Sequence, residues 1–179
     1  MTGGRKITQG QLARADQAWQ WAGMAAVSIR PYTPDDLDTL IALFNGSVRR
    51  VAGRDYTPAQ IAAWAPETPD RAAWAKRLLG RPTLVAQIEG VIAGFSDLEP
   101  DGHIDMLFVD ADHQGRGVAG ALLDRIDTMA RDQGLARLFT EASITARPVF
   151  EHRGFHVVAV QDVALRGQTL RNYRMAKAL

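Results

Sequence analysis

The chain has 179 residues, 21 Lys and Arg against 20 Asp and Glu, and no cysteine. This length suits one domain with a substantial core, and the near-neutral charge gives no reason to expect nucleic acid or a membrane surface as partner. The missing cysteines exclude disulfides and thiolate metal sites, and the four histidines lack the spacing of a zinc helix, so no metal is expected. Neither a membrane-spanning apolar run nor a secretory signal is visible, so the cytoplasm is the expected location.

Residues 1–26 are polar and differ in composition from the rest of the chain. We expect them to be an N-terminal extension, helical or disordered, ahead of a single domain over residues 27–179. Thr33 and Pro34 mark the start of the first helix of this domain, because a hydroxyl cap and a fixed φ both favour a helix N-terminus. The elements predicted first are a strand at 27–32 and helices at 33–51, 56–65 and 68–80.

A block rich in strands follows these helices. Residues 82–90, 91–99 and 103–109 are separated by short turn sequences, which predicts an antiparallel meander. A glycine-rich loop and a helix that ends at Gly134 come next. The last predicted elements are a strand at 136–142, a short helix at 144–153 and a hairpin of 155–165 with 168–179. The pattern indicates an α+β domain with a mixed sheet and no internal repeat.

The sequence DHQGRGVAGALL, residues 112–123, lies between a predicted strand and a predicted helix. A helix N-terminus has unpaired amide donors and a partial positive charge, and glycine lets a phosphate approach the backbone closely. The alternative is a tight turn whose glycines have only a structural role in packing and bind no ligand. Gly115, Gly117 and Gly120 also match the dinucleotide-binding pattern G-x-G-x-x-G, but no βαβ unit precedes them.

Three segments of this chain together resemble one family. Gln114 to Ala119 match the Q/R-x-x-G-x-G/A signature of the GNAT superfamily of N-acetyltransferases. MLFVDADH (106–113) resembles the fourth strand of that family with its turn, and PVFEHRGF (148–155) resembles a segment further downstream. The resemblance extends over residues 27–179 and is to a bacterial subgroup. It implies the GNAT fold: a central, mostly antiparallel sheet of about seven strands flanked by helices, with a V-shaped splay between the fourth and fifth strands.

The resemblance also implies acetyl-CoA as co-substrate, held in the splay. The pantetheine arm is expected on the fourth strand and the pyrophosphate on the amides of the glycine loop. Ser143 stands where many relatives carry an asparagine that touches pantetheine, although it also suits a helix cap. Phe150 replaces a tyrosine that serves many relatives as general acid, and is expected to pack against the thioester end of the cofactor. The residues expected to bind the cofactor are Leu107, Phe108, Val109, Gln114, Gly115, Arg116, Gly117, Val118, Ala119, Ser143 and Phe150.

Acetyl transfer to an amine also needs a group that removes the ammonium proton. His103 and Asp105 are two residues apart on the predicted fourth strand, so they share one face, and either is a candidate base. Glu141 is a further candidate proton acceptor, and Tyr173 on the final strand is a candidate acid. For each of these residues an ordinary structural role is the alternative. Phe44, Tyr56 and Trp64 are candidates to line an apolar acceptor pocket, although most such aromatic residues belong to a core.

We therefore expect an enzyme that transfers the acetyl group of acetyl-CoA to a primary amine of a small-molecule or peptide acceptor, by direct attack in a ternary complex. Two other classes of protein stay open. An acyl-CoA sensor with little or no turnover is favoured by Phe150 in place of tyrosine. A nucleotide-binding oxidoreductase rests on the three glycines alone. Because proteins of this family are often dimers, a homodimer is also expected.

Overall fold

The computed structural model describes residues 26–179, so the extension predicted over residues 1–26 lies outside the described part except for its last residue. The helices in this part, apart from short 3-10 turns, are α2 (Leu37–Arg50), α3 (Pro58–Trp64), α4 (Arg71–Leu79), α5 (Val118–Asp132) and α6 (Arg147–His152). The strands are β1 (Val27–Pro31), β2 (Thr83–Ile88), β3 (Val91–Asp97), β4 (His103–Ile104), β5 (Leu107–Val109), β6 (Arg137–Ser143), β7 (His156–Leu165) and β8 (Gln168–Ala178).

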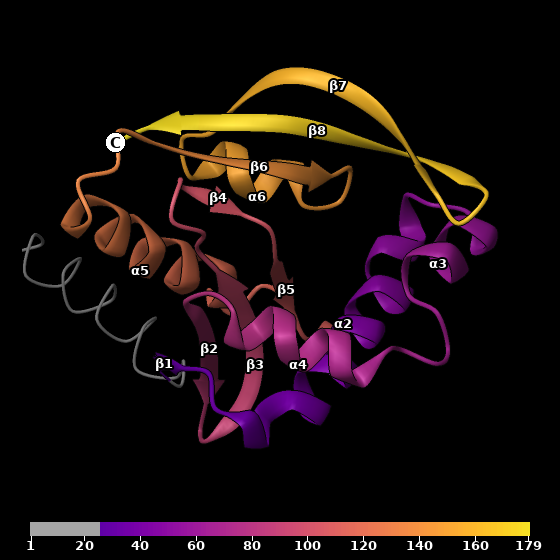
Figure 1. Ribbon diagram of the computed structural model, residues 1–179, viewed down its shortest axis with the longest axis horizontal. Helices are drawn as coiled ribbons and strands as arrows, with labels where there is room; N and C mark the ends of the chain where they lie inside the picture. The colour runs from indigo at the N-terminus through magenta and orange to yellow at the C-terminus, as the bar shows by residue number, and fades with distance from the viewer. Residues whose placement is uncertain (1–25) are drawn as a thin grey trace, which may run out of the picture.

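The strands form two four-stranded sheets, in the orders β1-β2-β3-β5 and β4-β6-β8-β7. Every pairing in them is antiparallel except that of β4 with β6. In Figure 1 the long β7–β8 hairpin extends from the C-terminal end of the chain towards α3. This arrangement confirms the predicted α+β fold with a mostly antiparallel sheet and flanking helices.

Two apolar clusters cover the two faces of the first sheet. Because successive side chains of a strand point to opposite faces, Leu84, Ala86 and Ile88 of β2 pack in the cluster with α5. Val85 lies between them in sequence and packs in the other cluster, with α2. The first sheet is therefore sandwiched between α5 and the group of α2, α3 and α4.

The strand predicted over residues 103–109 is broken in two. β4 pairs with β6, whereas β5 pairs with β3. At the break the buried Asp97 carboxylate accepts hydrogen bonds from the backbone N–H groups of Asp105 and Met106, at 3.0 and 2.8 Å. These hydrogen bonds give partners to two backbone N–H groups that have no strand partner between β4 and β5. The chain can therefore pass from one sheet to the other at this point. If β4 and β5 are counted as one broken strand, the total is the seven that was predicted.

The same break produces the predicted splay. β4 stays beside β6 through the pairs His103–Phe139 and Ile104–Thr140, and the Thr140 hydroxyl donates to the Ile104 carbonyl at 2.8 Å. Beyond Ile104 the chain follows β3 instead, so β5 and β6 diverge. One edge of β5 is thus without a strand partner in the described part of the chain. The Val109 carbonyl accepts the Gln114 side-chain amide at 3.0 Å, and the other backbone groups on that edge are available to a ligand.

Gly94 of β3 sets how closely α5 approaches the sheet. A Cβ at this position would lie 2.7 Å from Val118 Cγ1 and 2.8 Å from the Phe108 carbonyl oxygen, which is closer than side chains pack. Glycine at position 94 therefore lets the first turn of α5 rest against β3 and β5. The glycine-rich loop is held at the mouth of the splay as a result.

α3 is fixed to the C-terminal hairpin by two side chains. The Tyr56 hydroxyl donates to the Arg171 carbonyl at 2.6 Å and accepts from the Ile144 N–H at 3.0 Å. The Gln60 amide donates to the Thr169 carbonyl at 2.7 Å. These bonds join α3, the end of β6 and β8, and so close one wall of the space between the two sheets.

Candidate active site

A narrow slot runs along the free edge of β5. It has a volume of about 90 Å³ and reaches from α2 across β5 to the first turn of α5 and the start of α6. Six of the residues predicted to bind the cofactor line this slot: Leu107, Phe108, Val109, Gln114, Ala119 and Ser143. The divergence of β5 from β6 therefore creates a space next to unpaired backbone of the kind predicted for the pantetheine arm.

The glycine loop presents free amides at one end of this slot. Gly115 and Gly117 have φ values of 73° and 80°, which favour glycine over any other residue. No side chain caps α5, and within residues 26–179 the structure gives no backbone acceptor for the N–H groups from Gly115 to Ala119. A Cβ at Gly115 or Gly117 would meet nothing within 4 Å, so open space lies in front of the loop. Amides and space together fit an anionic ligand at a helix N-terminus.

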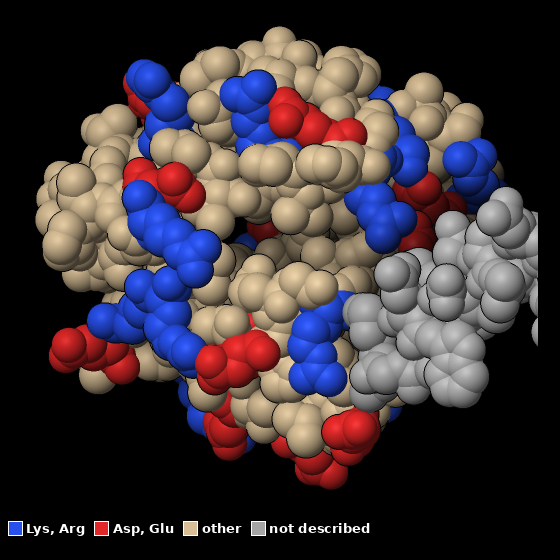
Figure 2. All heavy atoms as spheres, turned by 180° about the vertical axis from the view of Figure 1, so that it is seen from behind, with Lys and Arg blue, Asp and Glu red and all other residues tan. Residues whose placement is uncertain are grey.

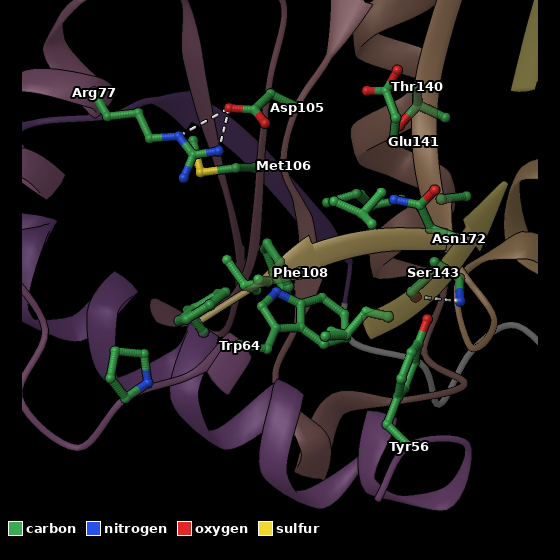
Figure 3. Close-up of a pocket in the computed structure, with 18 of the residues that line it drawn as sticks. Tyr56, Trp64, Arg77, Asp105, Met106, Phe108, Thr140, Glu141, Ser143 and Asn172 are labelled. Carbon is green, nitrogen blue, oxygen red and sulfur yellow. Dashed lines mark hydrogen bonds and ion pairs between the residues drawn. The ribbon is translucent and has the colours of Figure 1, made fainter. Parts of the chain in front are cut away.

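A larger cavity of about 500 Å³ adjoins the slot. Trp64, Leu107, Phe108, Ser143 and Ala146 line both spaces, so the two meet at the splay. In Figure 3 Arg77, Asp105, Thr140 and Glu141 lie towards one end of the cavity, and Trp64, Phe108 and Tyr56 lie towards the other. The cavity thus has a polar end and an aromatic end.

Basic side chains gather beside a hollow on one face of the molecule. Figure 2 shows the face opposite to that of Figure 1, with a hollow near its centre and Lys and Arg side chains gathered along one side of it. Basic groups beside a hollow attract ligands that bear phosphate groups.

Asp105 lines the cavity but its carboxylate is already paired. Arg77 Nε donates to Asp105 Oδ2 at 2.9 Å and Arg81 Nη1 donates to the same oxygen at 2.7 Å. Burial opposes ionisation of this carboxyl group, but the hydrogen bond from Arg77 and the charges of Arg77 and Arg81 outweigh burial and lower its pKa. An ionised carboxylate held by two guanidinium groups is a weak proton acceptor.

His103 lies between two carboxylates. Its Nε2 is 2.6 Å from Glu141 Oε2, its Nδ1 is 3.2 Å from Glu99 Oε2, and its ring stacks on Phe139. Burial opposes protonation, but the hydrogen bonds and charges of Glu141 and Glu99 outweigh it and raise the His103 pKa above 6.5. Glu141 lines the large cavity, whereas His103 does not line it and contacts the Glu141 carboxylate. Because the strand ends at Ile104, His103 and Asp105 have different partners and not one shared face.

Ser143 lies where the two spaces meet, and Phe150 lies at the large cavity alone. Ser143 lines both spaces, and its hydroxyl also accepts the Ala146 N–H at 3.0 Å, so it caps the turn before α6 as well. Phe150 lines the large cavity and is buried, with its ring centroid 5.1 Å from that of Phe155. Both positions are compatible with contact to a bound cofactor.

Tyr56 and Tyr173 differ in their access to the cavity. Tyr56 lines it, whereas Tyr173 lies among the residues of neither the slot nor the cavity. The Arg147 guanidinium stacks on the Tyr173 ring at 4.7 Å from the centroid. Burial raises the Tyr56 pKa, although the hydrogen bond from Ile144 opposes that effect. From the sequence Tyr56 is a candidate only for apolar lining, because nothing in the sequence indicates that its hydroxyl points to β6 and β8.

Two further findings concern the described residues only. In residues 26–179 no group of three or more His, Asp or Glu side chains is placed to hold a metal ion. No helix in this part of the chain is both long enough and apolar enough to cross a membrane.

The fold and the site define a class of protein: an α+β domain with a broken central strand and a glycine loop with free amides at the mouth of the splay. Comparison with known proteins agrees with this class. The model of the acetyltransferase (GNAT) domain family matches residues 52–177. The uncharacterized N-acetyltransferase YafP of Escherichia coli K12 is 38% identical over 152 residues, which cover 85% of this chain and 96% of that protein.

Solved structures show the same similarity. A crystal structure of a GCN5-related N-acetyltransferase from Rhodopseudomonas palustris is similar with a TM-score of 0.83 and 38% identity, covering 87% of this chain and 98% of that one. The PaiA N-acetyltransferase of Thermoplasma acidophilum, solved in complex with coenzyme A, has a TM-score of 0.71 and 16% identity, covering 86% of this chain and 99% of its own. The chain belongs to the GNAT acetyltransferase family, and it is an acetyl-CoA-dependent acyltransferase.

Proposed function

We propose that this protein transfers the acetyl group of acetyl-CoA directly to a primary amine in a ternary complex. The observation that carries the proposal is the junction of the slot and the cavity at the splay, where both are lined by Leu107, Phe108 and Ser143. Two ligands that enter from the two sides would meet there without a covalent enzyme intermediate. The chain contains no cysteine that could act as an acyl carrier.

The residues at the slot fit acetyl-CoA, which when bound supplies the activated acetyl group. The free edge of β5, from Leu107 to Val109, would hold the pantetheine arm by its backbone groups. The free amides from Gln114 to Ala119 would hold the pyrophosphate, with Arg116 adding a positive charge at the loop. Ser143 and Phe150 would border the thioester end. The open space in front of Gly117 supports this assignment.

For removal of the ammonium proton, the geometry favours His103 acting through Glu141 over Asp105. Glu141 lines the cavity with one carboxylate oxygen bonded to His103, and a proton taken up by Glu141 can pass to the imidazole. Asp105 is engaged by two arginines and better serves to position Arg77. For the leaving thiolate, Tyr173 stays a prediction, whereas Tyr56 lines the cavity but its hydroxyl already donates its proton to the Arg171 carbonyl at 2.6 Å.

Two further features of the proposal concern assembly and location. We propose a homodimer that forms through the outer face of β7, because Val158 and Val160 are more than half exposed there on the edge strand of its sheet. Sedimentation velocity tests this: the Val158→Lys and Val160→Lys variants should shift the protein to monomer. The cytoplasm remains the proposed location, with no nucleic acid or membrane partner.

The transferase activity is tested by release of coenzyme A thiol with a panel of primary amines. Because the chain has no cysteine, a thiol reagent reports only the product. Amine-dependent thiol release together with a mass increase of one acetyl group on the amine supports the proposal. Tight binding of acetyl-CoA without thiol release in the presence of any amine of the panel would favour the acyl-CoA sensor instead. Thermal stabilisation by NAD but not by acetyl-CoA would favour the oxidoreductase.

A further inference from the structure

The aromatic end of the large cavity forms one continuous wall. The ring centroids of Phe44 and Trp74 are 5.0 Å apart, those of Phe44 and Phe108 are 4.8 Å apart, and those of Tyr56 and Trp64 are 5.5 Å apart. These rings come from α2, α4, β5, α3 and the residues just before α3, and all line the cavity. Aromatic rings at such distances form a large, rigid apolar surface that a ligand can cover at little entropic cost.

The acidic side chains that line the cavity are nearly all engaged. Asp70 caps α4 by accepting the Ala73 N–H at 2.9 Å, and Asp105 is held by Arg77 and Arg81. Glu141 bonds His103 through Oε2 alone and pairs with no arginine among the described residues. Asp70 and Asp105 also bond through one oxygen each, but Asp70 caps a helix and Asp105 is held by arginines, so Glu141 is the carboxylate best placed to receive a ligand ammonium group.

Basic side chains balance these acids. Arg77, Arg166 and Arg171 also line the cavity, which gives it three acidic and three basic side chains. A polyamine or an aminoglycoside carries several ammonium groups and needs several free carboxylates at its site. The cavity offers no such row of charges within residues 26–179, so it fits an acceptor with a single amine.

We infer that the acceptor is a small monoamine whose amino group is carried by a bulky apolar, preferably aromatic, body. This inference rests on the proposed transferase function and names its substrate class. The apolar body covers the wall of Phe44, Trp64 and Trp74, and the amine points from this wall towards Glu141 at the polar end, beside the junction with the slot. Two sources share this chemistry: a simple arylalkylamine and an apolar α-amino acid, whose carboxylate would lie towards Arg77.

The inference is tested by kcat/KM for a panel of amines, measured by thiol release. 2-Phenylethylamine and L-phenylalanine should exceed ethylamine and glycine by about 100-fold, since an apolar pocket discriminates strongly against the missing bulk. They should also exceed spermidine and kanamycin. L-Phenylalanine ahead of 2-phenylethylamine identifies the amino acid as the source, and the reverse order identifies the simple amine. Spermidine or kanamycin as the better acceptor would overturn the inference.

A variant of Trp74 tests whether the aromatic wall causes the preference for an aromatic amine. Trp74 lines the cavity but not the slot, so Trp74→Leu should reduce the ratio of phenylethylamine to ethylamine kcat/KM by about tenfold and leave the KM for acetyl-CoA unchanged. Leu79→Ala is the matched control, because Leu79 lies on the same helix and is 63% exposed. An unchanged ratio in the folded Trp74→Leu variant contradicts the inference.

Failure of the proposed transfer reaction is distinguishable from failure of this inference. Calorimetry with coenzyme A present measures amine affinity without turnover. If no amine releases thiol, a higher affinity for 2-phenylethylamine than for ethylamine and spermidine still supports the acceptor class. Equal affinities for the three amines overturn it.

Discussion

Gly117→Leu separates the two roles that a glycine can have in the loop. Gly117 precedes the first turn of α5 with φ 80° and ψ 3°, in the left-handed region, and an added Cβ would meet no atom within 4 Å. The fold therefore resists a side chain here only through the backbone conformation. Gly134 is a matched control at the other end of α5, because it has φ 71° and its Cβ would also meet nothing.

The two variants should have similar effects on stability and different effects on the binding of acetyl-CoA. Leucine in the left-handed region costs about 1 to 2 kcal/mol, and this cost should be similar for Gly117→Leu and Gly134→Leu. At Gly117 alone the side chain would occupy the space in front of the free amides. Loss of one or two charge-assisted hydrogen bonds to a pyrophosphate is worth about 3 kcal/mol, which corresponds to a rise of about 100-fold in the KM for acetyl-CoA.

The assay combines thermal unfolding with initial rates at varied acetyl-CoA. Both variants should lose a similar few degrees in Tm, and only Gly117→Leu should lose affinity for acetyl-CoA, with a direct titration agreeing with the KM. A normal KM in the folded Gly117→Leu variant would refute the reasoning, because the amides would then be free of any ligand. An equal rise in KM for Gly134→Leu would show that the effect is general destabilisation.

Three further predictions follow from charged and polar contacts. Arg30 donates to the Asp36 carboxylate and lowers its pKa to about 2. Asp36→Asn should therefore lower the free energy of unfolding by about 2 kcal/mol at neutral pH. Because the folded-state pKa is depressed, this stability should be present above about pH 4 and be lost as the pH falls towards 2, which urea unfolding at several pH values measures. His103 has a raised pKa, so kcat should rise with pH through a value above 6.5, and His103→Gln should remove that limb of the pH profile. Tyr56→Phe should lower the free energy of unfolding by about 1 to 2 kcal/mol, because it removes the hydrogen bonds of the hydroxyl to the Arg171 carbonyl and from the Ile144 N–H; an unchanged stability in urea unfolding would contradict this role.

The sequence was sufficient for the features that depend on local chemistry. Glycines 115 and 117 directly after a strand indicated a loop that needs positive φ and a helix with an open N-terminus, and both are present. Thr33, Thr57 and the prolines that follow them marked the starts of helical turns. Periodicity also placed the helices and the C-terminal hairpin, because these elements form by contacts between residues close in the chain.

Only the tertiary structure decided how distant residues combine at the site. The break at Asp105 depends on the buried Asp97, which accepts two amides from a strand that a sequence pattern treats as continuous. The pairing of His103 with Glu141 joins residues 38 positions apart and requires the parallel contact of β4 with β6. The access of Tyr56, and not Tyr173, to the cavity likewise depends on packing between α3 and β8. Such contacts are set by which sheet each strand joins, and no local preference in the chain encodes that choice.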